Sequence, residues 1–149
     1  MFKRFNKKGF TLIELLAVIV VLAIIMLLAV QAVLPQMEKA RKNAFLVEAH
    51  AALDAAEAYT VQQALESGAQ NAGSGFKVKI SKLIEDNYYD ARGDYKGCVT
   101  VSYSGGKYTY TLSMGNGQYK VSDFTSSSTL SAVSSGTSSE ATAFESSCS

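Results

Sequence analysis

The sequence has few of the residues from which enzymes build a reactive centre. Its single histidine, His50, lies between Glu48 and Asp54 in a helical pattern, which is typical of a solvated helix face. The chain contains no CxxC pair, phosphate-binding loop, HExxH or EF-hand spacing. These absences predict a protein that is not an enzyme and that needs neither a metal nor a cofactor.

Charge is also scarce. Charged residues make up 18% of the 149 residues and the formal net charge is +1, which argues against bulk electrostatic binding to nucleic acid. The first basic residues nevertheless form a group that contains no acid: Lys3, Arg4, Lys7 and Lys8. This group precedes an apolar run, so the positive-inside rule predicts a cytoplasmic amino end with the rest of the chain outside.

One long apolar run dominates the first quarter of the sequence. Every residue from 15 to 30 is apolar, and the run continues to Leu34 after one break at Gln31. A helix over 10–34 would be about 37 Å long, enough to cross a hydrocarbon core of roughly 30 Å. A carboxylate, Glu14, lies inside the run, although an acidic group costs roughly 2.5–3.5 kcal/mol near the bilayer centre. An ordinary membrane anchor does not explain it.

The stretch KGFTLIEL, residues 8–15, resembles the type III signal of type IV pilins and type II secretion pseudopilins. In that family a membrane prepilin peptidase cuts after the glycine, on the cytoplasmic side, and methylates the new amino terminus. The resemblance therefore implies cleavage between Gly9 and Phe10, N-methylation of Phe10 and retention of the apolar segment.

The resemblance also implies a role for Glu14 in assembly. Cleavage creates an amine at Phe10, and in the family picture Glu14 of one subunit pairs with the Phe10 amine of a neighbour, which sets the axial register. A pair within one chain is the alternative, because Phe10 and Glu14 are one helical turn apart. A third alternative is that the two arrangements alternate, within one chain in the membrane and between chains in the fibre.

Two plainer interpretations stay open for the apolar run. A secretory signal peptide also has a basic start and an apolar middle, and Val30 and Ala32 would suit a cut after Ala32. A single-span anchor needs only the apolar length. Neither explains Gly9 or Glu14.

The helix is predicted to run on to 67, with a kink or local break at Pro35 and with Gly68 as its terminator. Beyond Pro35 the pattern becomes amphipathic, with small and apolar residues at steps of mostly three and four. A sheet is expected to lie across this stripe. Its members are Met37, Ala40, Ala44, Val47, Ala51, Ala55, Ala58 and Leu65.

The rest of the sequence, after the long helix, predicts a small sheet and hence an α+β fold. Residues 68–97 are expected to form a loop with one short helical turn at 81–85, capped by Ser81. Apolar and hydroxylated residues alternate over 98–121, with glycine turns between the runs, which predicts a three-stranded antiparallel meander packed on the helix. Residues 122–149 are rich in Ser and Thr, a composition typical of flexible or extended chain.

The two cysteines, Cys98 and Cys148, both lie in the part predicted to be outside the cell. Oxidising surroundings favour a disulfide between them, and the chain-entropy model gives roughly 4 kcal/mol for closing such a loop. Two unrelated thiols are the alternative.

Two short motifs leave minor alternatives open. Asp86, Asp90 and Asp94 fall in one loop, as calcium ligands do in some pseudopilins, but their spacing matches no known loop. Residues 92–94 spell Arg-Gly-Asp, an integrin-recognition tripeptide whose glycine is first of all a turn signal.

Together these patterns predict a type IV pilin precursor that polymerises with itself into a surface filament for adhesion, motility, DNA uptake or biofilm formation. A pseudopilin of a secretion or competence system is the first alternative, and an anchored binding domain that never polymerises is the second. The implied partners are prepilin peptidase, an inner-membrane assembly platform and membrane lipid before assembly, with no specific nucleic acid. The expected divisions are a leader (1–9), a transmembrane or filament-core helix (10–35), an amphipathic helical half (36–67), a connecting loop (68–97), the meander (98–121) and a Ser/Thr-rich region (122–149).

Overall fold

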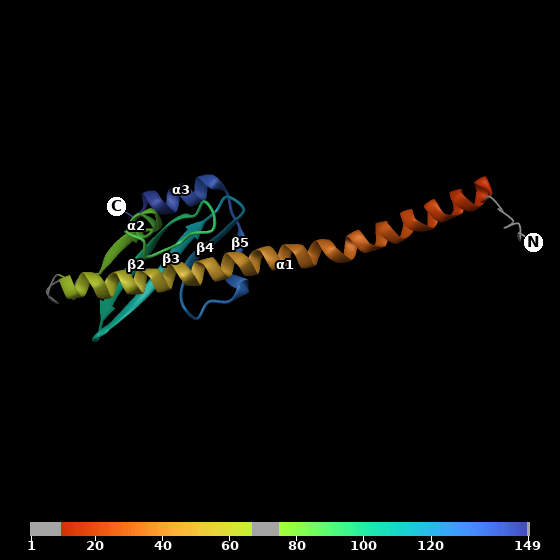
Figure 1. Ribbon diagram of the computed structural model, residues 1–149. Coiled ribbons are helices and arrows are strands. Elements are labelled where there is room, and N and C mark those ends of the chain that lie inside the picture. Colours follow the sequence, from red (N-terminus) through yellow and green to blue (C-terminus); the bar gives the residue numbers. More distant parts are fainter. Residues whose placement is uncertain (1–9, 67–74, 149) are drawn as a thin grey trace, which may run out of the picture. The chain divides into compact units, whose positions relative to one another are not determined.

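The computed structural model describes residues 10–66 and 75–148 (Figure 1). It divides into two compact units, Met1–Ala40 and Arg41–Ser149, each of which is described by itself. The predicted cleavage residue Gly9 and the predicted helix terminator Gly68 lie outside the described residues. The elements in chain order are α1 (Leu12–Glu66), β1 (Phe76–Lys79), α2 (Ile80–Glu85), β2 (Lys96–Ser104), β3 (Lys107–Gly115), β4 (Tyr119–Phe124), the 3-10 turn η1 (Leu130–Ala132), β5 (Ser134–Ser135) and α3 (Ser138–Ser146).

The α+β class and the long amino-terminal helix are confirmed, but the sheet has five strands rather than the predicted three. Its order is β1-β2-β3-β4-β5 and all neighbours are antiparallel. The predicted meander corresponds to β2, β3 and β4. The two missed strands are edge strands of four and two residues, too short for an alternating pattern to be recognised.

Alternation sets the register of the central hairpin. Val99 lies opposite Leu112 and Val101 opposite Tyr110, so that the apolar residues of β2 and β3 share one face. The two strands are joined at Gly105 and Gly106, which have φ values of 59° and 82°. A two-residue hairpin turn with both central residues in the left-handed region favours glycine at both positions.

The helix assignment of α1 runs through Pro35 without interruption, so the predicted local break there is wrong. Proline removes a single backbone donor, and the hydrogen bonds on either side can carry the helix past it. The predicted kink stays a prediction.

The face of α1 that packs on the sheet differs from the predicted stripe. Of the predicted stripe beyond residue 40, only Ala55 is buried, whereas Ala44, Val47, Ala58 and Leu65 are exposed. Alanines occur on several sides of this helix, and the stabilisation from burial follows apolar area, so the larger side chains of Phe45 and Leu53 decide which side turns inward. The buried residues of α1 are Phe45, Ala49, Ala52, Leu53, Ala55, Ala56 and Thr60.

The core lies between α1 and one face of the sheet. Phe45 is 2% exposed, and its ring centroid lies 5.9 Å from that of Tyr95 and 6.0 Å from that of Tyr119. Val99 and Leu112 are fully buried against the same cluster. These contacts join α1 to residues from far along the chain, which fixes the orientation of the helix within this unit.

The short helix α2 begins one residue earlier than predicted and is not capped by Ser81. Its N-cap is Lys79, which makes no side-chain capping bond. Ile80 and Leu83 are both fully buried, so burial of two apolar side chains, rather than a cap, holds this turn. It ends at Glu85, and Asn87, two residues later, has a left-handed φ of 59°, a conformation that asparagine tolerates.

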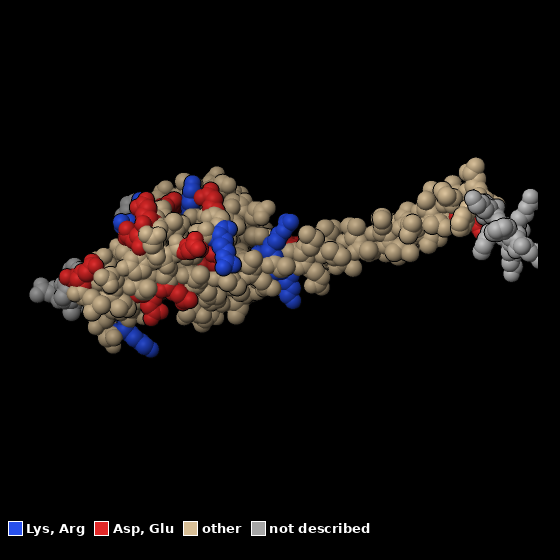
Figure 2. Space-filling view, in the orientation of Figure 1, with Lys and Arg blue, Asp and Glu red and all other residues tan. Residues whose placement is uncertain are grey.

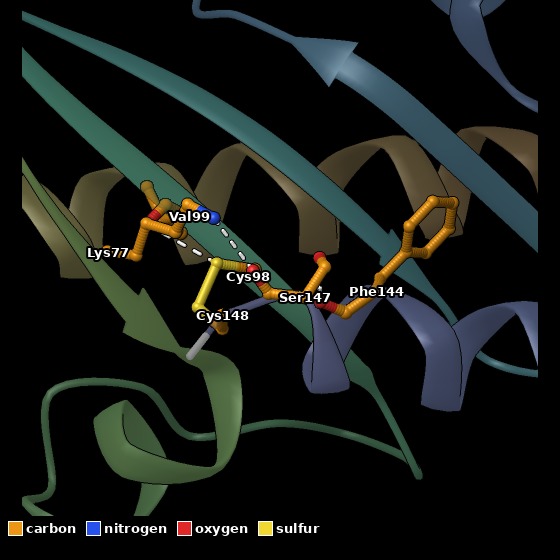
Figure 3. Close-up of a disulfide and its surroundings, with 6 residues drawn as sticks. All are labelled: Lys77, Cys98, Val99, Phe144, Ser147 and Cys148. Carbon is orange, nitrogen blue, oxygen red and sulfur yellow. Dashed lines mark hydrogen bonds between the residues drawn. A yellow bond between two sulfur atoms is a disulfide. The ribbon is translucent and has the colours of Figure 1, made fainter.

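Residues 122–148 are not the flexible or extended segment that their composition predicts, because they contain η1, β5 and the nine-residue helix α3. Neighbouring residues of a strand point to opposite faces of a sheet. In β2, Val99 belongs to the core shared with α1, whereas Cys98 is bonded to Cys148, which lies just after α3. Helix α3 therefore packs on the sheet face opposite α1. Figure 3 shows the sheet with α3 in front of it and α1 behind.

Candidate functional site

The amino-terminal part of α1 exposes apolar side chains in every direction. Each large apolar side chain from Phe10 to Leu34 is at least 50% exposed. Among the described residues, α1 is the one helix long and apolar enough to cross a membrane, with a mean hydropathy of 3.2 in its most apolar window and none of that window buried. Figure 2 shows an almost uninterrupted surface without Lys, Arg, Asp or Glu along this part. Such a surface needs a cover of lipid or of other protein.

Glu14 and Thr11 cap the start of α1 through reciprocal hydrogen bonds. The Thr11 backbone N–H and hydroxyl donate to Glu14 Oε2 at 3.3 and 3.2 Å, and the Glu14 N–H donates to Thr11 Oγ1 at 3.3 Å. This is a capping box, in which a Thr side chain and a Glu three residues later satisfy free backbone donors at a helix start. The sequence analysis missed Thr11, although the spacing T-x-x-E ahead of an apolar run is its signal.

The capping box places the carboxylate at the amino end of the helix, where the helix dipole stabilises negative charge. All three of its hydrogen bonds are exposed. Phe10 lies just before the helix and is 85% exposed. In the uncleaved chain the nitrogen of Phe10 is a peptide nitrogen, so pairing of Glu14 with a Phe10 amine, in one chain or between two, stays a prediction.

Cys98 and Cys148 form a disulfide, as predicted. Their Cα atoms are 5.4 Å apart, and both residues are buried. Beside the bond, Lys77 Nζ donates to the Ser147 carbonyl at 2.7 Å (Figure 3). A cation at the carboxyl end of α3 suits the negative end of its dipole. The end of the chain is therefore tied to both β1 and β2.

The amino end of α3 has its own anchor. Thr137 and Glu140 form a second capping box, and Glu140 Oε1 also accepts a hydrogen bond from Lys120 Nζ of β4. Lys120, together with the hydrogen bonds from Thr137, holds the pKa of Glu140 below its usual range. Close packing adds to this anchor, because a Cβ on Gly115 would lie 3.1 Å from the Cβ of Ala141. Helix α3 is thus fixed at both ends and packed along its length.

The segment between α2 and β2 is tied to α1 by one buried tyrosine. The Tyr89 hydroxyl donates to Glu48 Oε2 at 2.9 Å, and Tyr89 is only 4% exposed. Burial, followed by the hydrogen bond to Glu48, raises the pKa of Tyr89 above its ordinary value. No local sequence signal marks this contact, because the two residues are 41 positions apart.

The sequence predicted that His50 lies on a solvated helix face, but its side chain does not. It is half-buried and packs edge-on against Phe124, with ring centroids 4.9 Å apart. It lies at the border between the buried and exposed sides of α1, where a sequence pattern does not assign a side.

The structure adds no support for either of the two short motifs, the aspartates in one loop and the Arg-Gly-Asp tripeptide. In residues 10–66 and 75–148, no group of three or more His, Cys, Asp or Glu side chains is placed to hold a metal, and this includes the three aspartates of the predicted calcium alternative. Arg92, Gly93 and Asp94 are all exposed, in the irregular segment before β2. Exposure permits recognition of the tripeptide but does not indicate it.

Comparison with known proteins gives one result. The family model described as the prokaryotic N-terminal methylation motif matches residues 4–30, which include Gly9, Phe10 and Glu14. No curated protein and no solved structure matches the chain significantly. The motif is the type IV prepilin signal, and it heads a long exposed apolar helix followed by a small antiparallel sheet. The chain therefore carries the amino-terminal methylation motif of type IV prepilins at residues 4–30, which supports the resemblance to type IV pilins and pseudopilins.

Proposed function

We propose that the chain is a structural subunit of a type IV pilus. Prepilin peptidase cuts after Gly9 and methylates Phe10, and the mature chain polymerises into a surface filament. One observation carries the proposal: the methylation motif at 4–30 heads a helix whose large apolar side chains, from Phe10 to Leu34, are all at least 50% exposed.

The apolar part of α1 suits two environments in turn. Burying one Leu, Ile or Val side chain yields roughly 1.5–3 kcal/mol, so a helix with this exposure is stable in lipid or in a bundle of like helices and unstable in water. The basic leader keeps its amino end in the cytoplasm, and the folded unit lies outside. A pilus assembled with the help of an inner-membrane platform exchanges the lipid cover for neighbouring copies.

Apolar packing alone does not drive that exchange, because lipid tails are as apolar as leucine. A polar group within the apolar segment makes the filament more favourable than the membrane. Glu14 is costly in lipid, and cleavage after Gly9 gives each neighbour a cationic amine at Phe10 with which Glu14 can pair. The exposed capping box with Thr11 supports this role, because it presents the carboxylate at the start of the helix, close to the new amino terminus.

The filament would serve adhesion, motility, DNA uptake or biofilm formation. A pseudopilin of a type II secretion or competence system is the alternative, since both groups carry the same signal. The Ser/Thr-rich external region after β4 favours a surface pilus. A subunit of either kind acts by assembly and carries no reaction of its own.

Electron microscopy of sheared fibres, labelled with antibody to this protein, tests the proposal. Long labelled fibres at native expression are the expected result. Labelled fibres that form only on overexpression would assign the chain to a pseudopilus. A chain that stays in the membrane under both conditions would be an anchored domain, and the proposal would be wrong.

A further inference from the structure

A groove with a volume of about 350 Å³ opens on the folded unit, between α1, β3 and the segment after β4. Binding sites for ligands occupy about 300–1,000 Å³ and combine aromatic walls with a few polar groups. This groove has that size and that composition, and all of its residues belong to the unit Arg41–Ser149. The residues that line it are Leu53, Asp54, Glu57, Tyr108, Thr109, Tyr110, Thr125, Ser126 and Ser127.

Two tyrosines form the aromatic wall of the groove. Tyr108 and Tyr110 are two residues apart on β3, so both point to the same face of the sheet. Their ring centroids lie 6.5 Å apart with 33° between the ring planes, and both side chains are half-buried. Burial, and to a smaller extent the charge of Glu57, raises the pKa of Tyr110 above its ordinary value. Tyr110 therefore stays uncharged near neutral pH, and an uncharged ring attracts a cation to its face.

Two carboxylates form a second wall. Asp54 and Glu57 are three residues apart on α1, which makes them neighbours on the helix surface. Both are exposed, and among the described residues neither forms an ion pair. The lining of the groove contains no Lys, Arg or His to balance their charge. A cation bound in the groove would attract both carboxylates and offset the repulsion between them.

The third wall is a turn that hydrogen bonds hold in place. The Ser128 N–H donates to the Thr125 carbonyl at 2.9 Å, and the Thr125 N–H donates to Ser128 Oγ at 3.0 Å. The hydroxyls of Thr125 and Ser127 lie 3.1 Å apart in the same turn. These bonds order the wall before a ligand arrives, and a preformed wall lowers the free-energy cost of binding.

We propose that this groove binds the guanidinium group of an arginine side chain that a partner protein presents. The guanidinium group is planar, so it stacks on a tyrosine ring while its N–H groups donate to carboxylates. The groove offers both kinds of contact, with rings from β3 and carboxylates from α1. The inference does not rest on the proposed polymerisation, because every residue of the groove lies in one folded unit.

The exposure of the walls favours a partner protein over a free small molecule. Asp54, Glu57, Ser126 and Ser127 are all exposed. Sites for small molecules bury about 70–90% of the ligand surface, which walls as exposed as these do not achieve. A side chain on a partner needs less enclosure, because the protein surface around it excludes water from the contact.

Other classes of ligand match the groove less well. The ammonium group of lysine is compact and strongly hydrated, so it gains less from a flat ring and makes no bidentate contact with a carboxylate. A neutral saccharide would leave the charges of Asp54 and Glu57 uncompensated, and an anion would be repelled by them. We therefore expect arginine to bind most tightly, lysine less tightly and neutral ligands least.

A titration of the full chain in neutral detergent micelles tests the inference by NMR. The protein carries isotope-labelled tyrosine, and the probe is the peptide acetyl-Gly-Arg-Gly-amide. The matched control peptide has citrulline in place of arginine, which keeps the shape and removes the charge. We expect the ring signals of Tyr108 and Tyr110 to shift while that of the buried Tyr89 does not. The arginine peptide should bind about tenfold more tightly than its control, the order that a charge-assisted hydrogen bond contributes.

Substitutions that remove charge test the role of the carboxylates. Asp54→Asn and Glu57→Gln keep the shape, so each should weaken binding of the arginine peptide severalfold. The double variant should bind the arginine and citrulline peptides equally. Tyr108→Leu should also weaken binding, because it removes one ring. Glu66→Gln is the matched control, since Glu66 is an exposed acid of α1 outside the groove. Unfolding midpoints in the same micelles check that each variant is folded.

Two results would remove the guanidinium site. One is equal binding of the arginine and citrulline peptides by the unmodified chain. The other is binding of the arginine peptide that persists when Asp54→Asn and Glu57→Gln are combined. Methyl glucoside that shifts the same tyrosine signals, while the arginine peptide does not, would make the groove a saccharide site instead.

Two further results would overturn the partner protein as the source of the arginine. Free methylguanidinium that binds as tightly as the peptide would indicate a small-molecule site. Tighter peptide binding by a chain with Arg92→Gln would show that the groove holds the exposed Arg92 of a second copy. None of these measurements requires a fibre, so failure of this inference and failure of the pilus proposal are told apart.

Discussion

The surroundings of helix α1 differ between the two units of this protein. From Leu15 to Leu34, α1 is apolar on almost every side and exposes all of its large side chains. After Arg41, it buries one side on its own sheet and presents polar residues and a narrow apolar ridge on the other. A helix that is apolar all round needs surroundings on all sides, and an amphipathic one needs a partner on one side. Apolar content alone therefore does not tell a core from an assembly surface; the position of the polar residues does.

Different forces hold the two units. The second has a packed core, a disulfide and two anchors on α3. In the first, the described side chains contact little beyond their own helix, and Glu14 makes its hydrogen bonds with Thr11. Substitutions in the first unit should consequently change assembly without changing folding, and substitutions in the second should do the reverse.

The largest effect is expected from Glu14→Ala. It should lower the amount of sheared fibre at least tenfold, because an incoming subunit loses the partner of a Phe10 amine. Cleavage, membrane insertion and the melting temperature of the folded unit should not change. Glu14→Gln keeps the shape without the charge, so an intermediate yield would show that hydrogen bonding alone can set register.

Thr11→Ala is the matched control for Glu14, because it removes the cap and keeps the carboxylate. A lost N-cap costs about 1 kcal/mol of helix stability, so fibre should persist. Normal fibre from the Glu14→Ala strain would contradict the assembly role.

Removing the disulfide should give the next largest effect, in the other unit. Replacing Cys98 and Cys148 together by Ser should lower the free energy of unfolding by about 4 kcal/mol in the chain-entropy model. Denaturant unfolding of the purified protein measures this, and membrane retention should be unaffected. Peptide mapping without reduction that finds both thiols free in exported protein would remove the claim.

A smaller loss is expected from Tyr89→Phe, which deletes the hydroxyl that donates to Glu48. The contact joins a buried group to a carboxylate, and such bonds contribute about 2 kcal/mol to stability. Tyr103→Phe is the control, because Tyr103 is 37% exposed at the end of the β2–β3 hairpin. Equal unfolding free energies for the two variants would show that the bond contributes nothing.

The smallest effect is a pH dependence at Glu140. Its folded-state pKa is depressed by Lys120, so its stabilising contribution is present above the unfolded-state pKa and is lost as the pH falls through the folded value. Glu140→Gln should flatten this acid limb of stability without changing the limb above neutral pH. Acid unfolding curves that coincide for the two proteins would show that the ion pair has no effect.

Local patterns predicted much of this molecule. The segment KGFTLIEL pointed to the family, alternation located β2, β3 and β4, and two exported cysteines pointed to their disulfide. The cap at Thr11 was also present in the sequence as T-x-x-E and was missed.

Long-range contacts limited the rest. The buried side of α1 depends on contacts of Phe45 and Leu53 with a sheet that begins only at Phe76, while alanines offered several equivalent sides. Helix α3 is stabilised by Lys120, Gly115 and Cys98, which are all distant from it in the sequence. Its Ser/Thr-rich composition therefore predicted flexible or extended chain where the structure has a helix. The contact of Tyr89 with Glu48 has no local signal at all.

The central claim is that the apolar part of α1 is kept as an assembly element and is not discarded as a signal peptide. Mass spectrometry of the amino-terminal peptide of the mature protein tests it most directly. The account predicts a chain that begins at Phe10 and carries one methyl group on its amine. A chain that begins at Val33, after a cut behind Ala32, would contradict it, because the exposed apolar helix and Glu14 would then be absent from the working protein.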